Sequence, residues 1–248
     1  MATRAKKYVA PIRSTSLPPD VVHSLTCGTK LLKNLEPPVC DALLTNGRPV
    51  TAKRGTYLLN QGESADACYV LLSGEIRLLL LTPGGKRVII DIIGPGHHLG
   101  FFVSLAHKDY PVSAEVIEPC ELFVWDAEFI RSLVYSSPKL TSTIISSLTD
   151  RVICLQSKVQ KLATDRIEQR VAYSLLSLAD SLGKQAPEGI LINVPLTHRD
   201  LAEMSGTNIY SVSRIFRRWE NDELILTGRR RVILCRPEQL ESLAMDGS

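Results

Sequence analysis

The stretch THRDLAEMSGTNIYSVSRIFRRW, residues 197–219, decides the fold of the C-terminal third of this 248-residue chain. It opens with Thr197 and has Asp200 three residues later, the spacing of a capping box at a helix N-terminus. An acid at that position also suits the positive end of the helix dipole. Gly206 is placed to end this helix, because glycine tolerates the left-handed backbone of a helix C-terminus. The sequence therefore predicts a short helix, a tight turn and a second helix starting near Asn208.

The second predicted helix has two faces of opposite chemistry. At about 100° per residue, its apolar side chains gather on one side and an arginine-rich stripe falls on the other. An α-helix fits the major groove of B-DNA, and Arg can donate two hydrogen bonds to guanine O6 and N7. An arginine-rich face can also be merely solvated, but the capped helix and glycine turn before it favour a DNA-binding helix-turn-helix. The apolar face contains Val212, Ile215, Phe216 and Trp219, and the outward face contains Tyr210, Arg214 and Arg217, flanked by Ser211 and Arg218.

A β-hairpin, or wing, is predicted at residues 224–234, with three arginines at its tip. Six arginines thus fall between Arg214 and Arg231. Such a cluster supplies the salt-dependent attraction to phosphates on which DNA binding depends, so double-stranded DNA is the predicted partner. Arg214 is the main candidate for a base contact. The predicted DNA-binding residues are Thr197, Thr207, Asn208, Tyr210, Ser211, Ser213, Arg214, Arg217, Arg218 and Arg230.

A regular apolar pattern precedes this region. Its steps alternate between three and four residues, the repeat by which two helices pair along their length. A helix lying on its own domain is the alternative, but such a helix usually shows a wider apolar stripe. We therefore predict a homodimer. A further helix at residues 167–181 and a loop at residues 184–189 should follow. The predicted interface residues are Ile145, Leu148, Val152, Leu155, Val159 and Leu162.

Short apolar segments separated by Gly and Pro occupy residues 31–125, which predicts an antiparallel barrel or roll. The predicted fold class is α+β, with an N-terminal antiparallel β-roll, a long dimerisation helix and a C-terminal winged helix-turn-helix. The predicted ranges are 1–29 for a flexible basic extension, 30–135 for the roll, 136–166 for the dimerisation helix and 167–248 for the DNA-binding domain.

Composition narrows the classes of function. Hydrophobic residues make up 44% of the chain, which is enough for a packed core. No run reaches the roughly 18 apolar residues of a membrane helix, and the basic N-terminus lacks the apolar segment of a secretion signal. The six cysteines form no C-x-x-C pair, as in proteins of reducing compartments. The sequence thus predicts a cytoplasmic protein with no membrane partner.

The order of roll, long helix and winged helix-turn-helix resembles the CRP/FNR family of bacterial transcription regulators. The resemblance covers roughly residues 31–240, and its most specific parts are residues 55–63, 69–76, 94–100 and 196–226. It implies a roll like a cyclic-nucleotide-binding jelly roll, a homodimer, and two recognition helices in successive major grooves of a near-palindromic operator. It also implies a transcription regulator rather than an enzyme, with RNA polymerase as a further candidate partner.

The candidate effector pocket departs from the family members that bind cyclic nucleotides. Those members have a Glu just after the roll glycine and an Arg beside a Ser or Thr before the next strand. Here Phe101 follows Gly100, and Val112 precedes Ser113. Apolar residues at both positions leave a cyclic phosphate uncompensated, which argues against cAMP in the usual pose. Together with Phe102, these residues line a pocket that is either filled by the two phenylalanines or open to a less polar ligand.

Cysteine and histidine positions bear on other effectors. The iron–sulfur members of the family need several closely spaced N-terminal cysteines, whereas this region has only Cys27 and Cys40, so no cluster is expected. Haem-linked gas sensing through His97, His98 or His107 remains an alternative hypothesis. Adjacent strand residues point to opposite faces, however, so the first two histidines cannot easily share a metal. The sequence therefore assigns no cofactor and no metal site.

The predicted recognition helix departs from the family pattern at one position. Family members often have Glu at the position of Tyr210, before the Ser and Arg that match Ser213 and Arg214, and Tyr cannot replace a carboxylate that accepts from cytosine N4. The usual half-site is therefore not expected.

The protein could also bind DNA constitutively with no effector. A cupin-like metalloenzyme is a remote alternative, because it needs several histidines and a carboxylate that converge inside the barrel.

Overall fold

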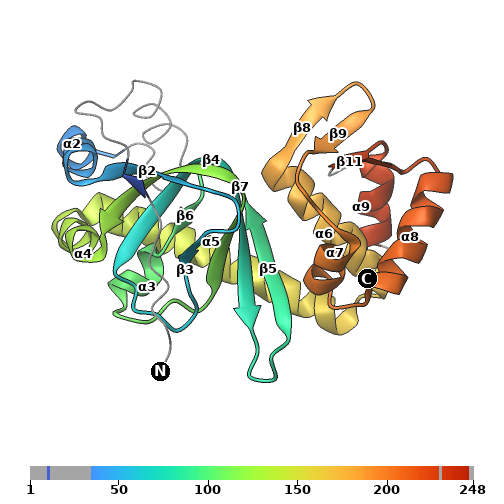
Figure 1. Cartoon of the computed structure of the whole chain (residues 1–248), viewed down its shortest axis with the longest axis horizontal. Helices are drawn as coiled ribbons and strands as arrows, with labels where there is room; N and C mark the ends of the chain where they lie inside the picture. Colours follow the sequence, from blue (N-terminus) through green and yellow to red (C-terminus); the bar gives the residue numbers. More distant parts are fainter. Residues whose placement is uncertain (1–9, 12–34, 229–230, 246–248) are drawn as a thin grey trace. The chain divides into compact units, whose positions relative to one another are not determined.

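The computed structural model describes residues 10–11, 35–228 and 231–245. They form two compact units (Figure 1). Unit 1 contains the described residues up to Leu81 together with Ile93–Val152, and unit 2 contains Thr82–Ile92 together with the described residues from Ile153 onward. The long helix α5 (Pro138–Thr164) contributes residues to both units, so the domain ranges drawn from the sequence stay predictions. Most of the predicted N-terminal extension lies outside the described residues.

Most strands of unit 1 belong to an antiparallel sheet with the order β1-β2-β7-β4-β5, in which β3 also pairs with β7 and β6 with β4. Except for Ile93, strand β5 of this sheet falls within the residues of unit 2. The pairing of the two longest strands, β4 and β7, is interrupted by irregularities around Gly74. Gly74 has a φ of 86°, and a Cβ there would collide with the Pro119 carbonyl, so only glycine fits this bend. The predicted antiparallel roll is confirmed. The strands are β1 (Ala10–Pro11), β2 (Arg48–Ala52), β3 (Tyr57–Leu59), β4 (Ala67–Leu81), β5 (Arg87–Ile93), β6 (His98–Leu99) and β7 (Ser113–Asp126).

Helices enclose one apolar cluster of the roll. Phe123 and Trp125 of β7 lie in this cluster with buried residues from four helices. The indole of Trp125 donates to the Leu43 carbonyl at 2.8 Å, so the one polar atom of this buried ring is satisfied. Asp126 fixes the start of the helix at residues 127–136, because its side chain accepts a hydrogen bond from the Glu128 amide. The helices are α2 (Pro37–Asn46), α3 (Phe101–Leu105), α4 (Ala127–Ser136) and the first turns of α5.

Unit 2 contains a four-stranded antiparallel sheet with the order β10-β11-β9-β8. The predicted wing is the β10–β11 hairpin, in which Leu226 pairs with Ile233. The prediction of a loop at residues 184–189 is wrong. This segment contains most of β8, the turn that follows it and the first residue of β9. The Lys-Gln sequence of β8 has no apolar alternation, and its pairing with β9 alone makes it a strand. The elements are α6 (Ile167–Leu182), β8 (Gly183–Ala186), β9 (Gly189–Ile192), α7 (His198–Met204), α8 (Ile209–Asn221), β10 (Ile225–Gly228), β11 (Arg231–Leu234) and α9 (Pro237–Met245).

No helix within the described ranges is both long and apolar enough to cross a membrane.

Candidate DNA-binding surface

The first helix of the helix-turn-helix is fixed by the predicted capping box. The Thr197 hydroxyl accepts from the Asp200 amide at 3.1 Å, and Asp200 Oδ2 accepts from the Thr197 amide at 2.9 Å. The same carboxylate oxygen accepts from the Thr197 hydroxyl at 2.8 Å. Asp200 is only 2% exposed, so its carboxylate is shielded from bulk water although Thr197 is exposed. The start of α7 is thereby held in one backbone conformation.

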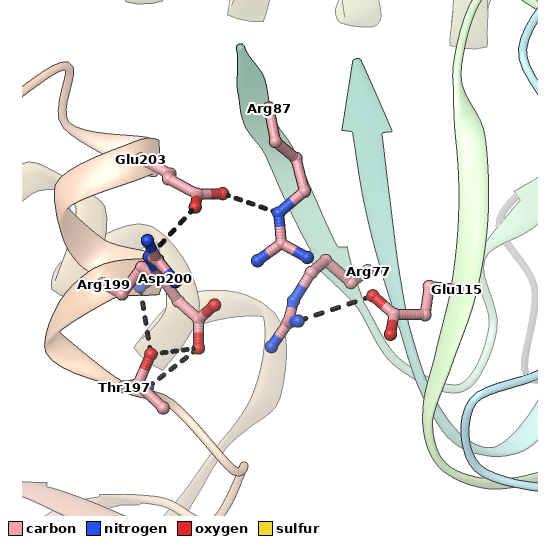
Figure 2. A network of polar contacts seen from close by, with 7 residues as sticks. All are labelled: Arg77, Arg87, Glu115, Thr197, Arg199, Asp200 and Glu203. Carbon is pink, nitrogen blue, oxygen red and sulfur yellow. Dashed lines mark hydrogen bonds and ion pairs between the residues drawn. The ribbon is translucent and has the colours of Figure 1, made fainter. Parts of the chain in front are cut away.

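Ion pairs occupy the flank of α7 (Figure 2). Arg87, which belongs to unit 2, lies 3.1 Å from Glu203, and Arg199 on the same helix lies 4.0 Å from this carboxylate. Figure 2 also draws the ion pair between Arg77 and Glu115, which joins β4 to β7 within unit 1 at 3.5 Å. The negative charge of Glu203 is therefore balanced by two neighbouring arginines.

The second helix has the two faces that the sequence predicts. Val212, Phe216 and Trp219 are buried, and the Asn208 side chain caps the helix by accepting from the Ser211 amide at 2.9 Å. On the opposite side Tyr210 is 87% exposed. The remaining candidates divide between exposed and partly buried positions. Arg214 and Arg217 are exposed, like Thr197 and Asn208, whereas Thr207, Ser211 and Ser213 are partly buried.

Two of the predicted DNA-binding arginines need separate comment. Arg218 forms an ion pair with Glu168 on α6, and the same carboxylate accepts from the indole of Trp219 at 2.9 Å. This ion pair competes with any phosphate contact of Arg218. No sequence pattern indicated the ion pair, because Glu168 lies far from Arg218 in the chain. Arg230 lies outside the described residues, so its role stays a prediction. Its neighbour Arg231 is exposed at the start of β11.

A contact missed by the sequence analysis joins the two helices of the motif. His198 Nδ1 lies 2.9 Å from Ser213 Oγ, and the His198 ring packs edge-to-face against Phe216 with centroids 4.9 Å apart. The two partners of the hydrogen bond are fifteen residues apart. No local spacing rule relates them, so the contact follows from the packing of α7 on α8.

The apolar residues of the predicted helical seam are exposed on α5. Ile145 is 59% exposed and Val159 is 67% exposed. This exposure disfavours the alternative in which the helix buries its apolar stripe against its own chain. All six predicted interface residues belong to this exposed set: Ile145, Leu148, Val152, Leu155, Val159 and Leu162.

The candidate effector residues do not form a charged pocket in unit 1. Gly100 adopts a φ of 84° directly before α3, and Phe101 is 1% exposed within the apolar cluster, where it packs against Trp125. Phe102 and Val112 are partly buried. The Ser113 hydroxyl accepts from the Gln61 amide at 2.9 Å. At the two positions where cyclic-nucleotide-binding relatives place an acid and a base, this chain therefore offers only apolar side chains.

The three candidate haem-binding histidines lie in unit 1, where His97 and His98 are partly buried and His107 is exposed. His98 packs edge-to-face against both Phe101 and Phe102, and its Nε2 lies 3.4 Å from Ser147 Oγ. Burial lowers the pKa of His98 from 6.5 to about 4, with further lowering by His97 and Arg151, so the ring is neutral at pH 7. His97 Nδ1 lies 3.0 Å from the Gly94 carbonyl. Within the described part of the chain, no group of three or more potential ligands could hold a metal ion.

The buried cysteines show the chemistry of packing residues. Burial raises the pKa of the Cys68 thiol to about 12, and burial likewise raises the pKa of the Cys120 thiol to about 12. Thiols with such raised pKa values stay protonated and unreactive at neutral pH.

Family models match both halves of this architecture. A cyclic nucleotide-binding domain model matches residues 49–137, and a Crp-like helix-turn-helix domain model matches residues 169–243. These ranges contain most of the roll and the whole helix-turn-helix with its wing.

Individual proteins are similar to most of this chain. The global nitrogen regulator of Synechococcus elongatus is 24% identical over 190 residues, which cover 76% of this chain and 86% of that protein. The CRP-like cAMP-activated global transcriptional regulator of Mycobacterium tuberculosis is 24% identical over 184 residues, covering 74% and 82%. The crystal structure of a CRP-family transcriptional regulator from Thermus thermophilus is 25% identical, with a TM-score of 0.66 and coverage of 79% of this chain and 97% of that chain. Together with the capped helix-turn-helix and the antiparallel roll, these matches show that the chain belongs to the CRP/FNR family of DNA-binding transcription regulators.

Proposed function

We propose that the protein is a homodimeric, sequence-specific DNA-binding regulator that inserts one α8 helix per subunit into successive major grooves of a near-palindromic operator. One observation carries the proposal: α8 exposes Tyr210, Arg214 and Arg217 on the face opposite its buried side. Arg214 is the proposed base contact, with guanine as its partner. Arg217 and the wing residue Arg231 are the proposed phosphate contacts.

The exposed apolar residues of α5 support the homodimer. Side chains such as Leu155 and Val159 would leave water if a second α5 packed against them, which is the main driving force for helix pairing. A second copy of this chain is the proposed partner, because a near-palindromic operator requires two identical recognition helices related by a twofold axis.

We propose that the protein does not recognise cAMP in the usual pose. Phe101 packs in the apolar cluster, and Val112 cannot neutralise a phosphate. These two residues also favour a second candidate function, in which the protein binds its operator constitutively. An effector can change operator affinity only if it binds the two states of the dimer with different affinities.

We propose that the protein acts in the cytoplasm as a transcription regulator rather than as an enzyme. The relatives named above, which are transcription regulators, support this proposal.

Selection of bound sequences from random duplex DNA tests the proposal. The protein is used as purified, with added cyclic nucleotides, and with haem. We expect enrichment of a twofold-symmetric sequence in every condition if binding is constitutive, and in one condition alone if an effector is required. Failure to enrich any symmetric sequence in all conditions would refute operator binding.

A further inference from the structure

His198 and Ser213 form a direct link between the two helices of the helix-turn-helix. The His198 imidazole is held at two points, by its Nδ1 contact to Ser213 Oγ at 2.9 Å and by its edge-to-face packing on Phe216. Phe216 is buried, so the ring rests on a fixed surface. The hydroxyl of Ser213 therefore has a partner whose position is set by the core of unit 2.

The backbone that bears His198 is also fixed. His198 is the first residue of α7 and directly follows Thr197, whose capping box with Asp200 sets the start of that helix. His198 is exposed to solvent, but its edge-to-face contact with Phe216 limits the orientations that its ring can adopt. The bond to Ser213 is thus pre-organised before any ligand arrives.

Ser213 lies where its hydroxyl can meet DNA. It directly precedes Arg214 and follows Tyr210 by three residues, which places it at the edge of the outward face of α8. It is partly buried, whereas both of these neighbours are exposed. If α8 enters the major groove, the Ser213 hydroxyl lies beside the base edges that Arg214 contacts.

A serine hydroxyl has one hydrogen to donate and two lone pairs to accept with. A freely rotating serine can therefore pair with amino groups or with carbonyl oxygens of bases, and it discriminates poorly between them. A hydroxyl that donates its hydrogen to Nδ1 of a neutral imidazole has only its lone pairs left. It can then accept a hydrogen bond from the amino group of a base but cannot donate one to a carbonyl oxygen, so donation from Ser213 to His198 is the arrangement on which the inference depends.

We propose that His198 is a positioning residue for base recognition: by holding the Ser213 hydroxyl, it makes that hydroxyl discriminate between amino-bearing bases (adenine, cytosine) and carbonyl-bearing bases (guanine, thymine) on the strand it faces. The inference rests on the proposed DNA binding through α8. It assigns a specificity role to a residue outside the recognition helix.

Two substitutions of His198 separate its hydrogen bond from its packing. His198→Phe keeps an aromatic ring against Phe216 and removes the bond to Ser213. His198→Asn gives up the ring but keeps a hydrogen-bonding group near the position of Nδ1. Ser213→Ala marks the base pair that the hydroxyl contacts, and Arg217→Ala serves as a control for loss of a phosphate contact. Each protein is subjected to selection on random duplex DNA, and affinities are referred to active protein titrated on its preferred site.

We expect Ser213→Ala to remove the preference at one base pair of each half-site. His198→Phe should lower the preference at that same pair by roughly three- to tenfold, the effect of one hydrogen bond, and leave the pair contacted by Arg214 unchanged. His198→Asn should keep the wild-type preference within about twofold, because the bond is restored. The double variant His198→Phe with Ser213→Ala should match Ser213→Ala alone, since both remove one interaction.

An unchanged preference in His198→Phe would overturn the inference, and so would an unchanged preference in Ser213→Ala. Equal weakening on all sequences, as expected for Arg217→Ala, would also overturn it, because His198 would then act as a phosphate contact. These results are distinct from failure of the proposed function, in which the wild-type protein itself selects no symmetric sequence.

Discussion

Lowering the pH should destabilise unit 1 through one residue, His98. Its pKa is lowered from 6.5 to about 4 by burial first, and then by His97 and Arg151. The unfolded chain therefore binds a proton that the folded chain rejects, so the stabilisation is complete above pH 6.5 and is lost as the pH falls toward 4. A shift of this size corresponds to about 3 kcal/mol at full effect. Because the ring is partly buried rather than sealed, we expect losses of about 1 kcal/mol by pH 5.5 and about 2 kcal/mol by pH 4.5.

The measurement uses the two tryptophans of the chain, one in each unit. In a Trp219→Phe background, the fluorescence of Trp125 follows urea unfolding of unit 1 at pH 7.5, 6.5 and 5.5, above the range where most carboxylates titrate. His98→Asn should abolish most of the pH dependence in this window, while His107→Asn, at an exposed position, should leave it intact. Parallel pH dependences in the His98→Asn variant and its parent would show that the ring is not held neutral by its surroundings.

Three further outcomes follow from the structure. Arg214→Ala should cost about 1–3 kcal/mol of discrimination at one base pair per half-site in competition binding, whereas Arg217→Ala should weaken all sequences and reduce the salt slope by about one; identical behaviour of the two variants would contradict their assigned roles. Leu155→Lys should give a monomer in analytical ultracentrifugation with loss of tight operator binding, and Gln156→Lys, on the next exposed residue, should remain dimeric; a tightly binding Leu155→Lys monomer would refute the helical seam. Gly74→Ala should lower the free energy of unfolding by about 2 kcal/mol or more in urea titrations, because the left-handed backbone and the Pro119 carbonyl leave no room for a Cβ; a stability equal to wild type would show that the strand can bend without glycine.

The helix-turn-helix could be predicted in detail because its signals are local. The capping pair Thr197 and Asp200 lies within one turn, and Gly206 and Asn208 mark the helix ends directly. The apolar face of α8 follows from its helical period alone. The roll could be predicted only as a class, since strand spacing indicates antiparallel pairing but not the order β1-β2-β7-β4-β5.

Sequence patterns did not predict the elements and contacts that depend on a partner far away in the chain. Strand β8 exists because β9 pairs with it, and its own polar residues favour a loop. The contact of Arg218 with Glu168 likewise has no counterpart in residue spacing. Such contacts form when separate helices pack, and their energies do not appear in any short window of sequence.

The sequence by itself determines three features of this chain: the roll, the helix with an exposed apolar seam, and the capped pair of helices that bears arginines. It can do so because helix caps, glycine turns and hydrophobic periods act over a few residues. Only the packing of the helices decides which serine hydroxyl is hydrogen-bonded, which arginine forms an ion pair and which histidine stays neutral. His198, Arg218 and His98 each owe their state to a neighbour brought close only by folding, since hydrogen bonds and desolvation act over a few ångströms and not along the chain.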